Sequence, residues 1–387
     1  MNFVLEHEHQ QLKELAARFV REELITLERR LLEREATGDD LELNAGERSK
    51  LDARARELGL WALDAPSEFG GSELPLVAMV GVNEELGRTA IPYEFPPDSP
   101  NLHMLAKTAN SQQREAYLGP YARGETVSAM AISEPGAGGD PAGMKTSAKR
   151  EGDSWVLNGR KIWVSRMNRA DFAIVMAVTD KAKGSRGGIS AFIVPAGTKG
   201  FIIERRIRMI GGHSTFELVF DDCRIPADGL LGEEGKGFGP MQGRLSSRRV
   251  QIAAWAVGTA QRALDMMLEH VPHRVTFGAP LSERQAVQWW IADAAMKIHA
   301  TRLMTYEAAA QIDRGGEART EVSMIKVFGS EMATEVVDHA MQAFGAMGMS
   351  KEMPLHVLAA RARKMRIYEG PSEVHRMVIA RNLLRGR

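Results

Sequence analysis

The stretch SWVLNGRKIWVS, residues 154–165, marks the point at which the sequence pattern changes from helical to strand-like. Its valine, isoleucine and tryptophan residues favour extended chain, and the Asn158-Gly159 pair between them predicts a tight hairpin turn. Similar short runs follow at residues 170–178, 188–196, 200–207 and 215–225, separated by glycine, proline, asparagine and aspartate. Because no helical run interrupts them, residues 123–232 are expected to form an antiparallel β-domain, a small barrel or a sandwich.

Both flanks of this region have helical periodicity. Residues 1–122 place apolar side chains three or four positions apart among many charges, which predicts an N-terminal α-helical domain. Residues 233–387 contain long amphipathic segments at 248–274, 283–313, 321–348 and 371–385. Helices of this length joined by short loops predict a C-terminal four-helix bundle. The sequence therefore predicts an α+β multidomain fold that is helical, then β, then helical.

The composition limits the classes of function. In the 387-residue chain, 50 lysine and arginine residues balance 50 aspartate and glutamate residues, so a general nucleic-acid-binding surface is not expected. Cys223 is the single cysteine, which excludes an intrachain disulfide and favours a reducing compartment. The first residues lack the pattern of a secretory signal, and no apolar run reaches membrane-spanning length, so we expect a cytoplasmic protein.

Several common cofactor motifs are missing from the sequence. It contains no Walker A loop and no strand–GxGxxG–helix unit, which argues against P-loop and Rossmann nucleotide binding. It also contains no histidine or cysteine spacing suited to a metal and no Gly-x-Ser-x-Gly nucleophile elbow. We therefore expect no metal site and no chemistry of the serine-hydrolase kind.

Several loops could bind a ligand, although each also has an ordinary structural explanation. Residues 131–143, AISEPGAGGDPAG, have enough glycine for main-chain amides to approach a ligand, but could equally form a surface loop. Trp163 and Ser165 share one face of a strand, which suits a planar ligand or a core face. Arg274, Thr276 and Phe277 could hold a pyrophosphate and an adenine, or Arg274 could simply interact with a helix dipole.

The remaining candidates lie near helix ends. The segment MQAFGAMG, residues 341–348, ends a helix with Gly345, which is most simply a C-cap. Glu369 precedes Gly370 and Pro371 at the start of the last helix, where a carboxylate is favoured by the helix N-terminus. Gly370 also leaves space beside that carboxylate for a ligand.

Taken together and in this order, the motifs resemble the acyl-CoA dehydrogenase family over essentially the whole chain. The segments that carry the resemblance are residues 131–148, 158–165, 210–226, 274–288, 342–348 and 366–381. The resemblance implies an N-terminal helical domain at 1–122, a middle β-domain at 123–232 and a C-terminal bundle at 233–387. It also implies FAD bound between the last two domains, and a homo-oligomer, usually a tetramer.

The resemblance implies roles for individual residues. Glu369 would be the catalytic base, and Arg249, Tyr368 and Gly370 would lie beside the substrate. The residues that would lie at the flavin ring or on its loop are Ser133, Gly138, Gly139, Trp163 and Ser165. The residues that would reach the pyrophosphate and adenosine of an FAD in a neighbouring subunit are Arg274, Thr276, Phe277, Gln342 and Gly345.

Three positions depart from the pattern of the family. Gly139 stands where many members have serine, Pro371 replaces a common threonine, and Ala346 replaces a common glycine. These changes affect individual FAD contacts and leave the chemistry intact.

A fourth position concerns the base itself. Some relatives carry their catalytic glutamate at the place that Arg248 occupies here, so no second carboxylate competes with Glu369. Arg248 and Arg249 could bind a carboxylated acyl chain, or could pair with acidic neighbours or a CoA phosphate, and the second alternative is favoured.

The reaction implied by the resemblance is FAD-dependent α,β-dehydrogenation of an acyl-CoA thioester. Glu369 would remove the α-proton, flavin N5 would take the β-hydride, and an electron-transferring flavoprotein would be the electron acceptor. The alternatives are a flavin oxidase of the same fold, a dehydrogenase of a carrier-protein-bound acyl thioester, and a non-enzymatic acyl-CoA- or flavin-binding protein. The presence of Glu369, Trp163 and Ser165 argues against the last alternative.

Overall fold

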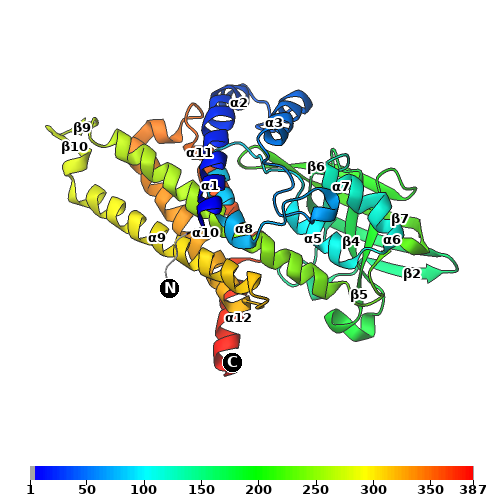
Figure 1. The fold of residues 1–387 in the computed structure, drawn as a ribbon. Coiled ribbons are helices and arrows are strands. Elements are labelled where there is room, and N and C mark those ends of the chain that lie inside the picture. Colours follow the sequence, from blue (N-terminus) through cyan, green and yellow to red (C-terminus); the bar gives the residue numbers. More distant parts are fainter. Residues whose placement is uncertain (1–4, 387) are drawn as a thin grey trace.

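The computed structural model describes residues 5–386, and it has the three parts predicted from the sequence: helices, a β-sheet and a second set of helices (Figure 1). The N-terminal helices are α1 His7–Phe19, α2 Thr26–Ala36, α3 Ala45–Glu57, α4 Leu76–Leu86, α5 Ser99–Thr108, α6 Ser111–Gln113 and α7 Gly119–Arg123. Local capping sets their ends: Asn44 and Glu47 form a reciprocal capping box at the start of α3.

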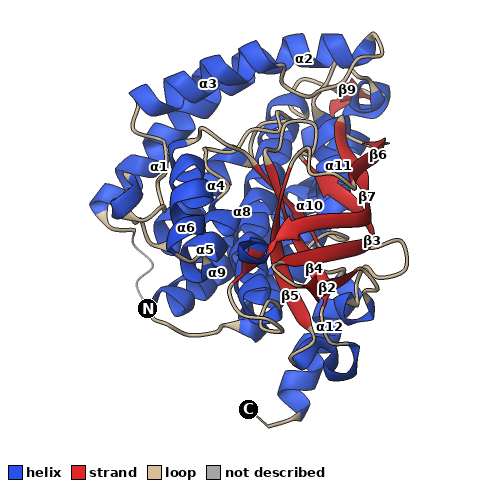
Figure 2. Cartoon of the chain, turned by 90° about the vertical axis from the view of Figure 1, so that its right-hand side faces the viewer, coloured by secondary structure: helices blue, strands red, loops and turns tan. Residues whose placement is uncertain are grey.

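The middle part is a mixed sheet. Its strands are β1 Ser128–Ala131, β2 Ser147–Glu151, β3 Ser154–Ser165, β4 Phe172–Val178, β5 Ile189–Pro195, β6 Phe201–Met209, β7 His213–Pro226 and β8 Leu230–Leu231. They pair in the order β6-β7-β3-β2-β4-β5-β8, and β1 pairs with β4. In Figure 2 the strands lie together at one side of the molecule, with the helices beside them.

This sheet differs from the predicted antiparallel barrel or sandwich in two ways. The pairs β1–β4 and β2–β4 are parallel, because the chain crosses over between these strands instead of returning through hairpins. In addition, no pairing joins the edge strands β6 and β8 within residues 5–386, so the sheet stays open. The sequence runs did identify the strands, but single runs do not determine which neighbour each strand pairs with.

The hairpin predicted at Asn158-Gly159 is wrong. Both residues lie inside the long strand β3, and a register shift against β7 occurs between Leu157 and Gly159. Asn158 exchanges hydrogen bonds with Asp222 of β7 at 2.9 and 3.0 Å. Gly159 has φ +145°, and a Cβ there would lie 2.5 Å from the Thr146 hydroxyl. The Asn-Gly pair therefore forms a β-bulge, which uses the same residue types as a tight turn.

The C-terminal part has α8 Phe238–His270, α9 Gln285–Asp313, α10 Arg319–Phe344, α11 Leu355–Met365 and α12 Ser372–Leu384. A short hairpin, β9 Val275–Thr276 and β10 Ala279–Pro280, joins α8 to α9. The four predicted segments correspond to α8, α9, α10 and α12. The helix α11 was not predicted from the sequence, and it lies against α10 and α8.

The two helical parts share one core. The N-terminal side chains Phe19, Leu24 and Ile91 lie in the same buried cluster as Ile252 of α8 and Val336 of α10. The helices α4 and α8 approach so closely that a Cβ on Gly258 would lie 1.9 Å from the carbonyl oxygen of Glu84. The long helix α8 is therefore fixed against both helical parts, and it also begins beside the sheet, where the Gly237 N–H donates to the Ile189 carbonyl at 2.9 Å.

Two searches of the described residues gave negative results. Within residues 5–386, no helix is both long and apolar enough to cross a membrane. In the same part of the chain, no group of three or more histidine, cysteine, aspartate or glutamate side chains is placed to hold a metal ion.

Candidate active site

Glu369 lies in the turn between α11 and α12, in a backbone conformation that is unusual for a residue with a side chain. Its φ is +55°, and that of Gly370 is +96°. The Glu369 carbonyl accepts from Arg249 Nε at 2.9 Å and from His375 Nε2 at 3.1 Å. The Gly370 carbonyl accepts from Lys326 Nζ at 2.9 Å. Helices α8, α10 and α12 thus fix the main chain around the predicted base.

The side chains that hold this turn are buried and partly neutral. Burial, together with Arg249 and Lys326, lowers the pKa of His375 to about 4, so its ring is neutral near pH 7. Burial and Arg249 lower the pKa of Lys326 to about 8. A Cβ on residue 370 would lie 2.8 Å from His375 Nε2, so only glycine fits between the base and this histidine.

The Glu369 carboxylate pairs with Arg244 of α8. Arg244 Nη1 donates to Glu369 Oε1 at 2.9 Å, and the two side chains are 7% and 16% exposed. Arg244 Nε also donates to Asn101 Oδ1 at 3.0 Å, and Asn101 Nδ2 donates to the Ser128 hydroxyl at 2.9 Å. The ion pair therefore joins α8, α5 and β1 to the turn that carries the base.

A second, partly buried group of charges lies next to this pair. Arg248 donates to Glu94 at 2.9 Å and to Asp98, and Arg166, which directly follows β3, donates to the same two carboxylates. Burial alone would raise the pKa of Asp98, but Arg166 and Arg248 lower it below its usual range. Arg248 thus pairs with acidic neighbours, as favoured from the sequence. The group also connects β3 to α8 close to Glu369.

The glycine-rich loop 131–143 lies between β3 and the turn of Glu369. The Ser133 carbonyl accepts from the Ile162 N–H at 2.9 Å, which places Ser133 beside Trp163. On the other side, a Cβ on Gly139 would lie 3.4 Å from the Pro371 ring. Gly138, by contrast, has open space around it. The loop thus brings Ser133, Gly138 and Gly139 between the strand of Trp163 and the turn of Glu369.

A buried ion pair fixes this loop. Lys161 of β3 is fully buried, and its Nζ lies 2.8 Å from Glu134 Oε1. The Glu134 carboxylate also accepts from the N–H groups of Lys145 at 2.6 Å and Thr146 at 2.9 Å. Burial lowers the pKa of Lys161 to about 8, although Glu134 opposes this shift.

Trp163 and Ser165 are both exposed at the end of β3. A bulge between Lys161 and Val164 gives Trp163 a φ of +62° and leaves its side chain 51% exposed. Ser165 is also exposed, and it pairs with Thr215 of β7, so the two side chains point to the same face. The Thr215 hydroxyl is buried and has no hydrogen-bond partner in the described chain. This face offers an aromatic plane and unsatisfied polar groups.

The other predicted residues lie at the far end of the bundle. The hairpin of β9 and β10 follows α8 at the far end of the helices (Figure 1). It carries Arg274, Thr276 and Phe277, and Phe277 is fully exposed at φ +49°. His270 at the end of α8 stacks on Phe344 at 4.1 Å, so Gln342 and Gly345 lie at this end too. From Arg249 to His270 the helix runs about 30 Å. In a single chain these residues are therefore separated from Glu369 and Trp163.

Tyr368 completes the predicted set. Its ring packs on the large helical core, with Lys326 Nζ 6.0 Å from the ring centre. Burial raises its pKa above the ordinary value, so the phenol stays protonated. The residue lies directly before the base in the chain.

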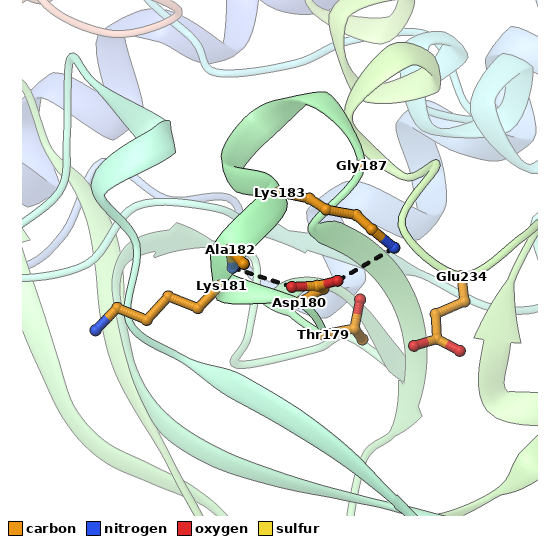
Figure 3. Close-up of a pocket in the computed structure, with 7 residues that line it drawn as sticks. All are labelled: Thr179, Asp180, Lys181, Ala182, Lys183, Gly187 and Glu234. Carbon is orange, nitrogen blue, oxygen red and sulfur yellow. Dashed lines mark hydrogen bonds and ion pairs between the residues drawn. The ribbon is translucent and has the colours of Figure 1, made fainter.

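A separate cavity of about 580 Å³ lies at the loop between β4 and β5 (Figure 3). Its lining carries charges of both signs, including Lys181, Asp180 and Glu234, and Lys183 pairs with Asp180 at 3.1 Å. None of the predicted site residues lines it. We therefore do not assign the active site to this cavity.

Sequence reasoning did not identify Arg244, His375, Lys326 or the Lys161–Glu134 pair. Arg244 and Lys326 lie on long amphipathic helices, where a basic residue usually faces solvent. The one usable signal was spacing: Arg244 lies four residues before Arg248, which predicts that the two arginines share a helix face. Its partner lies 125 residues away along the chain, and no local pattern indicates such a contact.

Comparisons with known proteins agree with this geometry. Family models for the N-terminal, middle and C-terminal domains of acyl-CoA dehydrogenase match residues 6–125, 129–223 and 235–384. The chain is 39% identical to (R)-benzylsuccinyl-CoA dehydrogenase of Thauera aromatica over 394 residues, which covers 99% of this chain and 97% of the relative.

Two solved structures have the same fold. Butyryl-CoA dehydrogenase of Megasphaera elsdenii superimposes with a TM-score of 0.89 at 32% identity, over 99% of this chain and 100% of that one. The FAD complex of PigA gives a TM-score of 0.89 at 27% identity over the full length of both chains. The three matching domain models and these relatives show that the chain belongs to the acyl-CoA dehydrogenase family, whose enzymes are oxidoreductases acting on CH–CH groups.

Proposed function

We propose that this protein dehydrogenates the α,β-bond of an acyl-CoA thioester and that Glu369 is the base that removes the α-proton. The observation that carries the proposal is the position of Glu369. Its main chain is fixed by Arg249, His375 and Lys326. The glycine-rich loop lies against the same turn at Gly139 and is bonded to the strand of Trp163 at Ser133.

The α C–H of a thioester is a weak acid, so its removal requires stabilisation of the enolate oxygen that develops. The N–H of Glu369 has no hydrogen-bond acceptor among residues 5–386, and it lies next to the carboxylate of the same residue. A thioester carbonyl that accepts this N–H therefore brings its α-carbon close to the base. One residue thus supplies both a proton acceptor and an oxyanion donor.

The open face on β3 fits a flavin. Trp163 offers a flat apolar surface, Ser133 and Ser165 offer hydroxyl and main-chain groups, and the Thr215 hydroxyl lacks a partner. When bound there, FAD supplies the acceptor for the β-hydride, while the protein supplies position and electrostatics. Gly138 and Gly139 allow the loop main chain to lie close to such a ligand.

The far end of the bundle fits the nucleotide half of an FAD held by a second copy of the chain. Arg274 and Thr276 can hold a pyrophosphate, and the exposed Phe277 can stack on an adenine. Gln342 and Gly345 lie at the same end. Because these residues cannot reach Trp163 of their own chain, we propose a homo-oligomer, a tetramer by family resemblance. An electron-transferring flavoprotein is the proposed electron acceptor, and the cytoplasm is the proposed location.

The test is rapid anaerobic reduction of the flavin by short-chain acyl-CoA thioesters. Glu369→Gln should keep its FAD and slow reduction by roughly 100-fold or more, because the amide cannot take a proton. Glu373→Gln, four residues further on an exposed turn of α12, is the matched control and should reduce at the wild-type rate. A Glu369→Gln enzyme that reduces as fast as wild type would overturn the assignment of the base. Reoxidation in air then distinguishes an oxidase, which reacts fast with O₂, from a dehydrogenase.

A further inference from the structure

Among residues 5–386, the only carboxylate that Arg244 bonds is that of the proposed base. Its Nη1 donates to Glu369 Oε1 at 2.9 Å, and its remaining side-chain bond, from Nε, goes to the neutral Asn101 at 3.0 Å. The Asn101 amide is in turn oriented by Ser128. The guanidinium is thus buried and fixed in place beside the reacting group before any substrate binds.

The two other arginines on this part of α8 are already engaged. Arg248 is neutralised by Glu94 and Asp98, which it shares with Arg166. Arg249 donates to the main-chain carbonyl of Glu369 and so holds the turn. Of the three, only Arg244 donates a hydrogen bond to the Glu369 carboxylate, whose charge must change during the reaction.

This arrangement creates an electrostatic conflict for an uncharged acyl chain. While Arg244 stays bound to Glu369, its Nη1 donates to Oε1 and so occupies one of the two carboxylate oxygens of the base. Once Glu369 has taken the α-proton, Arg244 loses the carboxylate that it bonds, and the nearby Asp98 already bonds Arg166 and Arg248, so the buried guanidinium is poorly compensated. A simple alkyl chain offers no group that resolves this conflict.

We infer that the acyl group of the substrate carries a carboxylate of its own. This carboxylate replaces Glu369 as the hydrogen-bond partner of Arg244, so that Glu369 is free to act as the base. This inference rests on the proposed function. A carboxylate matches the fork of a guanidinium and can bind it through two parallel hydrogen bonds. The α-proton then passes to Glu369, the electron pair of that C–H bond forms the new double bond, and the β-hydride leaves to the oxidised flavin. The substrate carboxylate is unchanged by the reaction.

The geometry also limits the length of the acyl group. Because Arg244 touches the base, a carboxylate that reaches it lies only a few bonds from the α-carbon. The substrate class is therefore a short dicarboxylic monothioester of the succinyl or glutaryl type, with or without a side group.

The first test compares substrates. The holoenzyme is assayed with succinyl-CoA and glutaryl-CoA, and with the uncharged butyryl-CoA and valeryl-CoA. We expect kcat/KM to be about 100-fold higher for the carboxylated thioesters, in line with a charge-assisted hydrogen-bonded pair. Equal or better turnover of the uncharged thioesters refutes the inference but leaves the proposed function intact. If none of the four thioesters, at any concentration, reduces the flavin, the proposed function itself fails.

The second test changes the arginine. Arg244→Met should lose the preference, because kcat/KM for the carboxylated thioesters falls about 100-fold relative to that for the uncharged ones, and Arg244→Lys should retain part of it. The matched control is Arg262→Met, which removes another partly buried arginine of α8, one that pairs with Glu28. This variant should keep the preference. An equal loss for both substrate classes in both Arg244 variants would indicate a merely structural role and refute the inference.

Binding gives a readout that does not depend on turnover. In Glu369→Gln holoenzyme, which cannot remove the proton, calorimetric titration should show succinyl-CoA binding about 100-fold more tightly than butyryl-CoA. Adding Arg244→Met to this variant should abolish the difference. A difference that persists without Arg244 would place carboxylate recognition elsewhere and contradict the inference.

Discussion

The ion pair between Lys161 and Glu134 gives a sharp test of how the glycine-rich loop is held. Lys161 is fully buried in β3, and its ammonium bonds to Glu134 and to the Ile132 carbonyl at 2.9 Å. Replacing it by methionine keeps most of the volume and removes the charge. Glu134, which is 7% exposed, then retains only the N–H groups of Lys145 and Thr146.

The magnitude follows from what each variant leaves behind. Breaking a buried pair by removing one partner costs about 3–5 kcal/mol, because the remaining charge is uncompensated. Since Glu134 keeps two main-chain donors, we expect Lys161→Met to lower the free energy of unfolding by about 3 kcal/mol, at the low end of that range. The double variant Lys161→Met/Glu134→Gln removes the uncompensated charge, so it should recover about half of this loss.

The assay is urea unfolding followed by far-UV circular dichroism, with amide hydrogen exchange to localise the effect. Exchange should increase in residues 131–146, which contain the loop, before it increases in α8. Lys149→Met, an exposed lysine on β2, is the matched control and should change stability by less than about 0.5 kcal/mol. The reasoning is refuted if Lys161→Met costs less than about 1 kcal/mol, or if the double variant is less stable than the single one.

Three further predictions concern the turn of the base and the two ends of α8. Gly370→Ala should lower the rate of flavin reduction by about 100-fold without loss of FAD, because the new Cβ would lie 2.8 Å from His375 Nε2 and shift Glu369. A wild-type rate of flavin reduction in stopped-flow measurements would contradict this. His375 has a folded pKa of about 4 against an unfolded value of 6.5, so it supplies stability that is present above pH 6.5 and lost as the pH falls toward 4. Urea unfolding at several pH values should show that the free energy of unfolding depends less steeply on pH in His375→Gln, by about one proton. An unchanged pH dependence would count against this role. Co-expressed Glu369→Gln and Arg274→Ala chains should be more active together than either alone, since a mixed oligomer contains sites with both groups intact; additive activities would argue against sites shared between chains.

The sequence predicted the order of the three parts because this order depends on local patterns. The role of Glu369 came from the resemblance of the ordered motifs to the family, and it stays a prediction. Helical periodicity, β-rich runs and the order of the motifs are all properties of neighbouring residues. The bulge at Gly159 was misread as a hairpin because both structures need a glycine with positive φ. What separates them is the partner strand β7, whose Asp222 binds Asn158 from 64 positions away.

The electrostatics of the site were beyond sequence reasoning for a related reason. Arg248 and Arg244 lie one turn apart on one helix, and a single sequence gives no means of telling them apart. Their different roles arise from α5 and its preceding loop, which bring Glu94 and Asp98 to one guanidinium and only Asn101 to the other. The chemistry of each arginine is thus decided by a segment from a different part of the fold.

The structure also connects two departures from the family pattern that seemed independent in the sequence. Gly139 and Pro371 each remove a hydroxyl that many members carry, and they lie against one another: a Cβ at residue 139 would be in van der Waals contact with the Pro371 ring, 3.4 Å from its Cγ. A serine at 139 would place its hydroxyl beside an apolar ring, and a threonine at 371 would face a glycine that offers no side chain. The contact between the loop and the turn of the base is therefore apolar at this point. Gly139→Ser alone should accordingly lower the free energy of unfolding more than Gly139→Ser combined with Pro371→Thr.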